Sequence, residues 1–132
     1  MIILDTSAVR ALAGGHKVLN QLAANMANTP SDRLWVPALC LVQAESEDAG
    51  AGRAVLAFSS VSIDILDTVA SVTVGTLVRD GFGGPDTCHA LYCASPRAEF
   101  TGMSILLTAH EDRYPPGAVT VDIDSPGMLD YH

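Results

Sequence analysis

The sequence has few aromatic, cysteine and basic residues, and it has no long apolar run. Its 132 residues include one Trp, three Tyr and three Phe, and its 7 Lys and Arg residues are outnumbered by 15 Asp and Glu. The longest nearly unbroken apolar stretch, from Trp35 to Val42, is far shorter than the ~20 residues that a membrane-spanning helix needs. The chain reaches Asp5 before any basic residue, which is not the pattern of a secretory signal. We therefore expect a soluble, cytoplasmic protein without a membrane partner.

The cysteines do not form the pattern of a metal site or a disulfide framework. Cys40, Cys88 and Cys93 are odd in number, and the sequence contains no Cys-x-x-Cys pair, whereas structural zinc sites use closely paired ligands. All three lie among apolar neighbours. The sequence therefore predicts buried free thiols in a reducing compartment.

The shortage of basic residues excludes a broad nucleic-acid-binding face. The formal net charge is −8, and the seven basic residues are scattered along the chain without a cluster. Such faces bind by neutralising phosphates with many Lys and Arg side chains. A nuclease whose metal ions meet the phosphate locally remains compatible with this charge.

What the chain does contain is enough apolar material for one folded core. Hydrophobic residues make up 48% of the sequence and the mean hydropathy is +0.29, which is too apolar for intrinsic disorder. The length fits a single domain over residues 1–132. Runs of β-branched and apolar residues predict strands, and three- and four-residue spacing predicts helices. The expected strands cover 2–4, 34–36, 61–65, 104–108 and 119–123, and the expected helices cover 6–13, 18–28, 37–48, 67–80 and 85–94. Alternating strands and helices indicate an α/β domain with a mainly parallel sheet.

Several polar residues follow predicted strands, where parallel α/β sheets bind ligands. Asp5 follows the first strand, Asp86 begins a helix, and Thr108, His110 and Asp112 follow the strand that ends near residue 108. Acids from separate segments that meet at one edge repel each other unless a cation lies between them. Carboxylates and waters suit Mg²⁺ or Mn²⁺, and phosphate is the usual partner of such an ion.

Each acid also has a structural interpretation. Asp5 is placed to cap the following helix, which is worth ~1 kcal/mol. Asp86, next to Pro85, is placed to complement a helix dipole. Glu45 and Glu47 are also explained by a solvated helix face. His89, three residues after Asp86, is expected either to bond that carboxylate or to be a half-buried helix histidine.

Together these segments resemble the PIN domain family, which includes the toxin ribonucleases of bacterial toxin–antitoxin modules. Four segments carry the resemblance and occur in the family's order along nearly the whole chain: Ile2-Ile3-Leu4-Asp5-Thr6-Ser7-Ala8-Val9, Val36-Pro37-Ala38-Leu39-Cys40-Leu41-Val42-Gln43, Asp86-Thr87-Cys88-His89-Ala90, and Leu106-Leu107-Thr108-Ala109-His110 with Asp112-Arg113-Tyr114. The resemblance implies a three-layer sandwich, with a mainly parallel sheet between helices. It also implies Mg²⁺- or Mn²⁺-dependent cleavage of single-stranded RNA, frequent homodimers and, for toxins, an antitoxin partner.

The resemblance assigns roles to particular residues. Asp5 and Asp86 match two of the family's acidic positions and are expected to hold the metal ion. With Asp112, they are the expected catalytic residues. The expected substrate-binding side chains lie beside these acids in the matched segments: Thr6, Ser7, Gln43, Thr108 and His110.

Two positions depart from the family pattern. Gln43 stands where the family has a Glu, and His110 stands where it has an acid after the threonine. Glu47 shares the helix face of Gln43 but lies one turn, ~5.4 Å, further along the axis, so it is a poor substitute. Asp112, in an expected loop, is a credible one. We therefore expect a weakened metal-dependent ribonuclease. The alternative is a catalytically inactive PIN-fold protein that acts as a binding or regulatory module.

Overall fold

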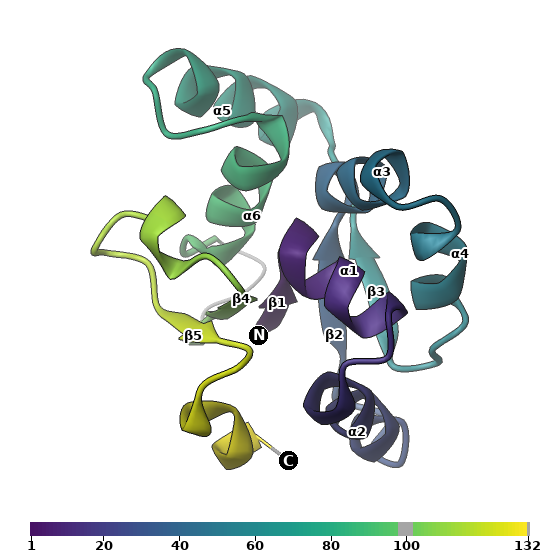
Figure 1. Ribbon diagram of the computed structural model, residues 1–132. Coiled ribbons are helices and arrows are strands. Elements are labelled where there is room, and N and C mark those ends of the chain that lie inside the picture. The colour runs from purple at the N-terminus through teal and green to yellow at the C-terminus, as the bar shows by residue number, and fades with distance from the viewer. Residues whose placement is uncertain (98–101, 132) are drawn as a thin grey trace.

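The computed structural model describes residues 1–97 and 102–131 (Figure 1). Five strands lie within these residues: β1 (Ile2–Leu4), β2 (Leu34–Pro37), β3 (Val61–Asp64), β4 (Ile105–Thr108) and β5 (Thr120–Asp122). The α-helices are α1 (Thr6–Ala13), α2 (Lys17–Met26), α3 (Ala38–Glu47), α4 (Ala51–Leu56), α5 (Thr68–Arg79) and α6 (Pro85–Ala94). Two 3₁₀ helices, η1 (Glu111–Arg113) and η2 (Pro126–Tyr131), flank β5.

The strands form one sheet in the order β3-β2-β1-β4-β5, and each neighbouring pair is parallel. The short apolar runs explain this arrangement, because strands of a parallel sheet are covered on both faces. Ile3 and Leu4 of β1 and Leu106 and Leu107 of β4 are all fully buried. Leu4 pairs with Leu107, so the ends of β1 and β4 lie side by side.

Helices cover both faces of this sheet. The chain moves from β1 through β2 to β3 in one direction, then returns past β1 to β4. Because parallel crossovers are right-handed, this reversal places α5 and α6 on the face opposite the earlier helices. α6 contacts β1, β2 and β4, whereas α1 contacts β1 and β4 and α4 contacts β3. Figure 1 shows α5 and α6 at the upper left, away from α2 and α4. The prediction of an α/β fold with a mainly parallel sheet between helices is confirmed.

The predicted elements occur with small shifts at their ends, and one α-helix and both 3₁₀ helices were missed. Pro37, expected in the first turn of a helix, instead ends β2, and its ψ of 136° keeps it extended before α3. Helix α4 was not predicted. Gly50, which lies just past the expected helix 37–48, directly precedes α4 in a left-handed conformation with φ 91°, a conformation that glycine adopts without a Cβ clash.

Two aspartates cap helices in the same way. Asp5 accepts a hydrogen bond from the backbone N–H of Ala8 at 3.0 Å, and Asp67 accepts one from Ala70 at 2.8 Å. A side-chain oxygen at this position satisfies one of the unpaired N–H groups of the first turn. The capping role expected for Asp5 is therefore present, and it fixes the start of α1 directly after β1.

The three cysteines lie in the apolar interior of the protein. Cys40, Cys88 and Cys93 are buried free thiols, as predicted. Burial raises the pKa of the Cys40 and Cys93 thiols, which keeps both protonated. Among the described residues, no helix has both the length and the apolar character that crossing a bilayer requires.

Candidate functional site

The candidate site lies at the carboxyl edge of the sheet, where the chain changes direction between β1 and β4. Strand order reverses at this pair, and such switch points open a crevice between the loops that leave the two strands. Asp5 follows β1 directly, and Thr108 is the last residue of β4. The strand register therefore brings together residues that are about a hundred positions apart in sequence.

Asp86 reaches this edge from the first turn of α6. Thr6, at the start of α1, donates its hydroxyl hydrogen to Oδ2 of Asp86 across 2.6 Å. Pro85 occupies the first position of α6, where a missing N–H costs no hydrogen bond. The sequence expectation that the segments of Asp5 and Asp86 meet is supported by this contact between neighbouring residues.

Asp5 lies at the centre of a buried hydrogen-bond network. Its Oδ1 accepts from the Ser7 hydroxyl at 2.6 Å and from the Ala8 N–H at 3.0 Å. Its Oδ2 accepts from the Thr108 hydroxyl at 2.6 Å and from the Tyr114 hydroxyl at 2.7 Å. Only 5% of Asp5 is exposed. A carboxylate offers about four acceptor positions, so these four donors account for all of them.

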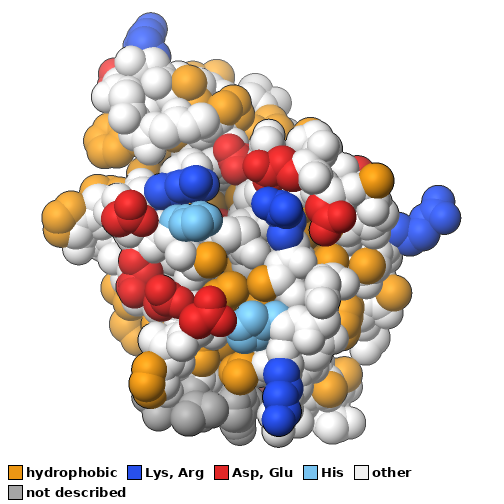
Figure 2. All heavy atoms as spheres, in the orientation of Figure 1, with side chains coloured by type: hydrophobic (Ala, Val, Ile, Leu, Met, Phe, Trp, Pro, Cys, Tyr) orange, Lys and Arg blue, Asp and Glu red, His pale blue; other side chains and the backbone are white. Residues whose placement is uncertain are grey.

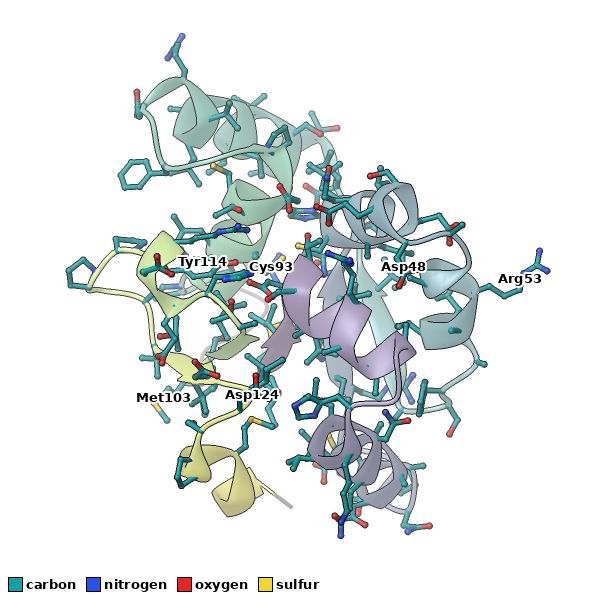
Figure 3. The ribbon with its side chains drawn as sticks, viewed as in Figure 1. Asp48, Arg53, Cys93, Met103, Tyr114 and Asp124 are labelled. Atoms are coloured by element: carbon teal, nitrogen blue, oxygen red, sulfur yellow. The ribbon has the colours of Figure 1, made fainter. Side chains whose placement is uncertain are left out.

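Tyr114 keeps its proton in this environment. Burial raises the pKa of Tyr114, and the charge of Asp5 raises it further. The phenol is therefore a donor at neutral pH. In Figure 3, Tyr114 lies between the C-terminal loops and α1. Tyr114 directly follows η1, and its hydrogen bond to Asp5 connects η1 to the end of β1.

A cleft of about 460 Å³ opens over this network. Its walls come from α1, α3, α6, the loop before α6 and η1. The residues that line it are Thr6, Ser7, Arg10, Gln43, Glu47, Gly81, Phe82, Gly83, Gly84, Asp86, Thr87, His110 and Arg113. Figure 2 shows basic, acidic and histidine side chains gathered around the upper centre of this face, over η1, α1 and α3.

The structure brings most of the predicted site residues to this cleft. Those on its walls are Thr6, Ser7, Gln43, Asp86 and His110. Asp5 and Thr108 are buried beside it, where their hydrogen bonds support the wall residue Ser7. Asp112 is exposed on η1 and is not among the described residues that line the cleft.

Four side chains at this site were not among the expected site residues, although Glu47 had been weighed as a substitute and two of the others stood in a matched segment. Arg10 lies four residues after Thr6 on α1 and therefore on the same helix face, a spacing that was available in the sequence. Glu47 lines the cleft with Gln43, as the same spacing on α3 predicts, although it was rated a poor substitute. Arg113 lies three residues after His110. Tyr114 stood in the fourth matched segment, but a single aromatic residue in a loop carries no pattern that assigns it a role.

The charges on the cleft walls are mixed. Arg10 and Glu47 face each other at 3.9 Å, and both side chains are nearly half exposed. Such exposed pairs contribute only about 0–1 kcal/mol, so Arg10 is free to exchange partners. Arg113 and His110 provide two further basic groups on the side of η1. The cleft thus combines two guanidinium groups and an imidazole with two carboxylates.

His89 does not bond Asp86. It is fully buried on α6, and its Nδ1 accepts the backbone N–H of Leu39 at 3.2 Å. Among the described residues, its Nε2 has no hydrogen-bond partner. Burial lowers the pKa of His89, so the neutral ring is the form that fits here. The structural interpretation of this histidine therefore holds, with deeper burial than expected.

We tested whether the site residues fit the Mg²⁺ or Mn²⁺ ion that the resemblance implies. An ion on Asp5 would have to displace one of four well-placed donors, whereas Asp86 stands on the cleft wall with one described hydrogen bond, from Thr6. Within the described ranges, no group of three or more His, Cys, Asp or Glu residues is arranged to hold a metal ion. These residues fit an ion shared by Asp5 and Asp86 poorly, and that shared ion stays a prediction.

Comparison with known proteins adds no assignment. A scan against protein-family models gave no match, and a search of curated proteins found no similar sequence.

Proposed function

We propose that the chain is a PIN-like domain that binds single-stranded RNA in the cleft and cleaves it only weakly. One observation carries this proposal. Arg10, Arg113 and His110 line one cleft at the carboxyl edge of the sheet, beside Asp86, while Asp5 is buried under four hydrogen-bond donors. The cleft therefore favours binding of a phosphate chain over metal-assisted hydrolysis.

The net charge explains why RNA would bind locally. With a formal charge of −8, the protein as a whole repels phosphate, so an RNA chain needs a site with local basic groups. Two of the seven Lys and Arg residues line this cleft. Arginine is well suited to phosphate because its planar fork donates two parallel hydrogen bonds. Arg10 can leave its exposed pair with Glu47 at little cost.

Weak cleavage follows from the side chains at the acidic positions. Gln43 and His110 stand where the resemblance implies acids, so the cleft lacks two anionic groups that attract a divalent ion. An amide oxygen carries no net charge and holds Mg²⁺ or Mn²⁺ less firmly than a carboxylate. This supports a protein that keeps the binding surface but performs little hydrolysis.

The binding experiment compares two double variants of equal charge. Fluorescence anisotropy with a short labelled single-stranded RNA, in EDTA at low salt, gives the affinity of each protein. We expect Arg10→Gln with Arg113→Gln to weaken binding about tenfold or more, and to reduce the salt dependence by about 0.7 for each lost phosphate contact. Arg53→Gln with Arg79→Gln is the matched control, because both side chains lie away from the cleft walls and Arg53 extends from α4 into solvent (Figure 3). Equal losses in both variants, or no binding by the natural protein, would overturn the proposal.

A second candidate function is efficient Mg²⁺- or Mn²⁺-dependent endoribonuclease activity, as in a toxin. The observation that favours it is the carboxylate of Asp86 on the cleft wall with Glu47 on the facing helix. The test is cleavage of labelled single-stranded RNA with Mn²⁺, with Asp86→Asn as control. Efficient cleavage that the variant loses would support this function over weak cleavage. Equal cleavage by both proteins would identify a contaminant.

Partner proteins and location belong to the same proposal. We infer a cytoplasmic protein that forms a homodimer and, if it is a toxin, binds an antitoxin. Val69 and Val72 lie one turn apart on α5, and each is more than 60% exposed, which supports a protein contact at this helix. Sedimentation of the natural protein and of a Val69→Ser, Val72→Ser variant would test the dimer. A natural protein that sediments as a monomer would contradict it.

A further inference from the structure

The donors around Asp5 are directed by their own hydrogen bonds. The Ser7 oxygen accepts the backbone N–H of Ala109 at 2.9 Å, and the Thr108 oxygen accepts that of His110 at 2.9 Å. Each hydroxyl oxygen therefore already accepts one hydrogen bond, and each hydroxyl donates its own hydrogen to Asp5. The oxygen–oxygen distance is 2.6 Å in both cases. The backbone after β4 thus holds two of the four donors in place.

Tyr114 differs from the other two hydroxyl donors, because its oxygen accepts no described hydrogen bond. It bonds Oδ2 of Asp5 at 2.7 Å and is only 9% exposed, so its ring fills the space next to this oxygen. Its hydroxyl can be removed by Tyr114→Phe without changing the ring. Of the four donors, it is therefore the one whose loss frees an acceptor position with the least disturbance to the backbone.

An ion and these donors compete for the same oxygen. A divalent cation needs a carboxylate lone pair and must shed water to reach a buried group. Oδ2 already accepts two hydroxyl hydrogens, and Asp5 is not among the described residues on the cleft wall. Asp5 is therefore arranged as the acceptor of a cross-link between β1, β4 and the chain after η1.

We propose that Tyr114 keeps Asp5 from acting as a metal ligand, so that this carboxylate serves the fold and not an ion. The natural protein then binds no divalent ion through Asp5. Removing the Tyr114 hydroxyl opens one acceptor position on Oδ2 of Asp5. Tyr114 is in this sense a positioning residue, since it acts through Asp5.

Calorimetric titration with Mn²⁺ alone tests the proposal without RNA. We expect Tyr114→Phe to bind Mn²⁺ at least about tenfold more tightly than the natural protein, because the ion then no longer has to displace a hydrogen bond from the Asp5 carboxylate. Tyr92→Phe removes a hydroxyl elsewhere and should leave the affinity unchanged. Adding Asp5→Asn to Tyr114→Phe should cancel the gain, because the gain depends on the freed carboxylate.

A second variant guards against a loss of folding. Thr108→Val removes the other hydroxyl on Oδ2 and should also raise the Mn²⁺ affinity. Circular dichroism establishes that each variant is folded before titration. The proposal is overturned if the natural protein binds Mn²⁺ through Asp5 as tightly as Tyr114→Phe does, or if neither variant gains affinity. Both results are independent of RNA binding, so they are distinguishable from failure of the proposed function.

A second measurement tests the structural role of Asp5 itself. With EDTA present, we expect Asp5→Asn to lower the thermal midpoint strongly, because an amide group presents hydrogens to donors that need an acceptor. Asp86→Asn is the matched control and should lower it far less, since Asp86 has one described hydrogen bond and is partly exposed. Equal shifts in the two variants would contradict the role assigned to Asp5.

Discussion

Thr6 and Asp86 are joined by a hydrogen bond of 2.6 Å between residues 80 positions apart. This bond links the first turn of α1 to the first turn of α6 and orients the Asp86 carboxylate on the cleft wall. Gly84 lies two residues before Asp86, and a Cβ atom at this position would lie 3.3 Å from Oδ1 of Asp86. The position of the Asp86 carboxylate is therefore set by the hydrogen bond from Thr6 and by the space that Gly84 leaves free.

Thr6→Val should release Asp86 with little change in shape. We expect a loss of about 1 kcal/mol in the free energy of unfolding, because water can replace part of the bond at a partly exposed carboxylate. Thr87→Val is the control, since the Thr87 hydroxyl makes no described hydrogen bond in the same cleft. Urea unfolding measures both variants, and an equal effect would show that the Thr6 bond contributes nothing specific.

Gln43→Glu should raise the affinity of the cleft for Mn²⁺. The substitution adds a carboxylate to the wall that already carries Glu47 and Asp86, and a charged oxygen holds the ion more firmly than an amide. Calorimetric titration measures the change. Ser46→Glu adds the same charge at an exposed position of α3 outside the cleft walls and should have little effect. An unchanged affinity in Gln43→Glu would count against this geometry.

The stability of the fold should fall as the pH falls through the range in which free histidine titrates. Burial lowers the pKa of His89 below its ordinary value of 6.5, although the charge of Asp64 acts in the opposite direction. The unfolded chain therefore binds a proton at a pH where the folded protein does not. The contribution of His89 is fully present above pH 6.5 and decreases below it.

The thermal midpoint, measured from pH 8 to pH 5, checks the histidine prediction. His89→Gln should reduce its dependence on pH, because no proton then competes with the Leu39 N–H bond. His110→Gln, a change at an exposed histidine, should keep the dependence of the natural protein. If His89→Gln has the same pH profile as the natural protein, other groups cause the dependence.

The ion pair at the end of β3 should be costly to break on one side. Arg97 lies 2.6 Å from Asp64, with both side chains nearly buried, and its guanidinium stands 5.0 Å over the Tyr92 ring. Arg97→Met would leave a buried charge unpaired, and we expect a loss of about 3 kcal/mol. The double variant with Asp64→Asn should recover part of it. Urea unfolding measures both, and no recovery would assign the loss to the Tyr92 contact.

Local patterns in the sequence were sufficient to predict most of the fold. The apolar runs at residues 2–4 and 104–108 predicted buried strands, and Asp5 was expected to cap the helix that follows the first of them. Helix α4 was missed because its start depends on Glu45, whose carboxylate accepts the N–H groups of Gly50 and Gly52. This contact joins the last part of α3 to the start of α4. A hydrogen bond between a side chain and the backbone gives no periodic pattern in the sequence.

The candidate site was harder to predict because hydrogen-bond partners are not encoded in spacing. The sequence located Asp5, Asp86 and Gln43 near one edge, since strand ends and helix starts set their places. It could not tell that Asp5 faces inward to Tyr114 rather than into the cleft. That direction depends on which donors the chain after β4 supplies, and those donors meet Asp5 only in the folded sheet.

β1 occupies the middle of the sheet although, of the five described strands, it is synthesised first. One of its neighbours, β4, begins only at residue 105. During translation the central strand therefore waits with one edge unpaired until residues 105–108 have left the ribosome. Distant pairings of this kind slow folding, and a nascent chain that stops before β4 would present a hydrophobic edge to chaperones and proteases.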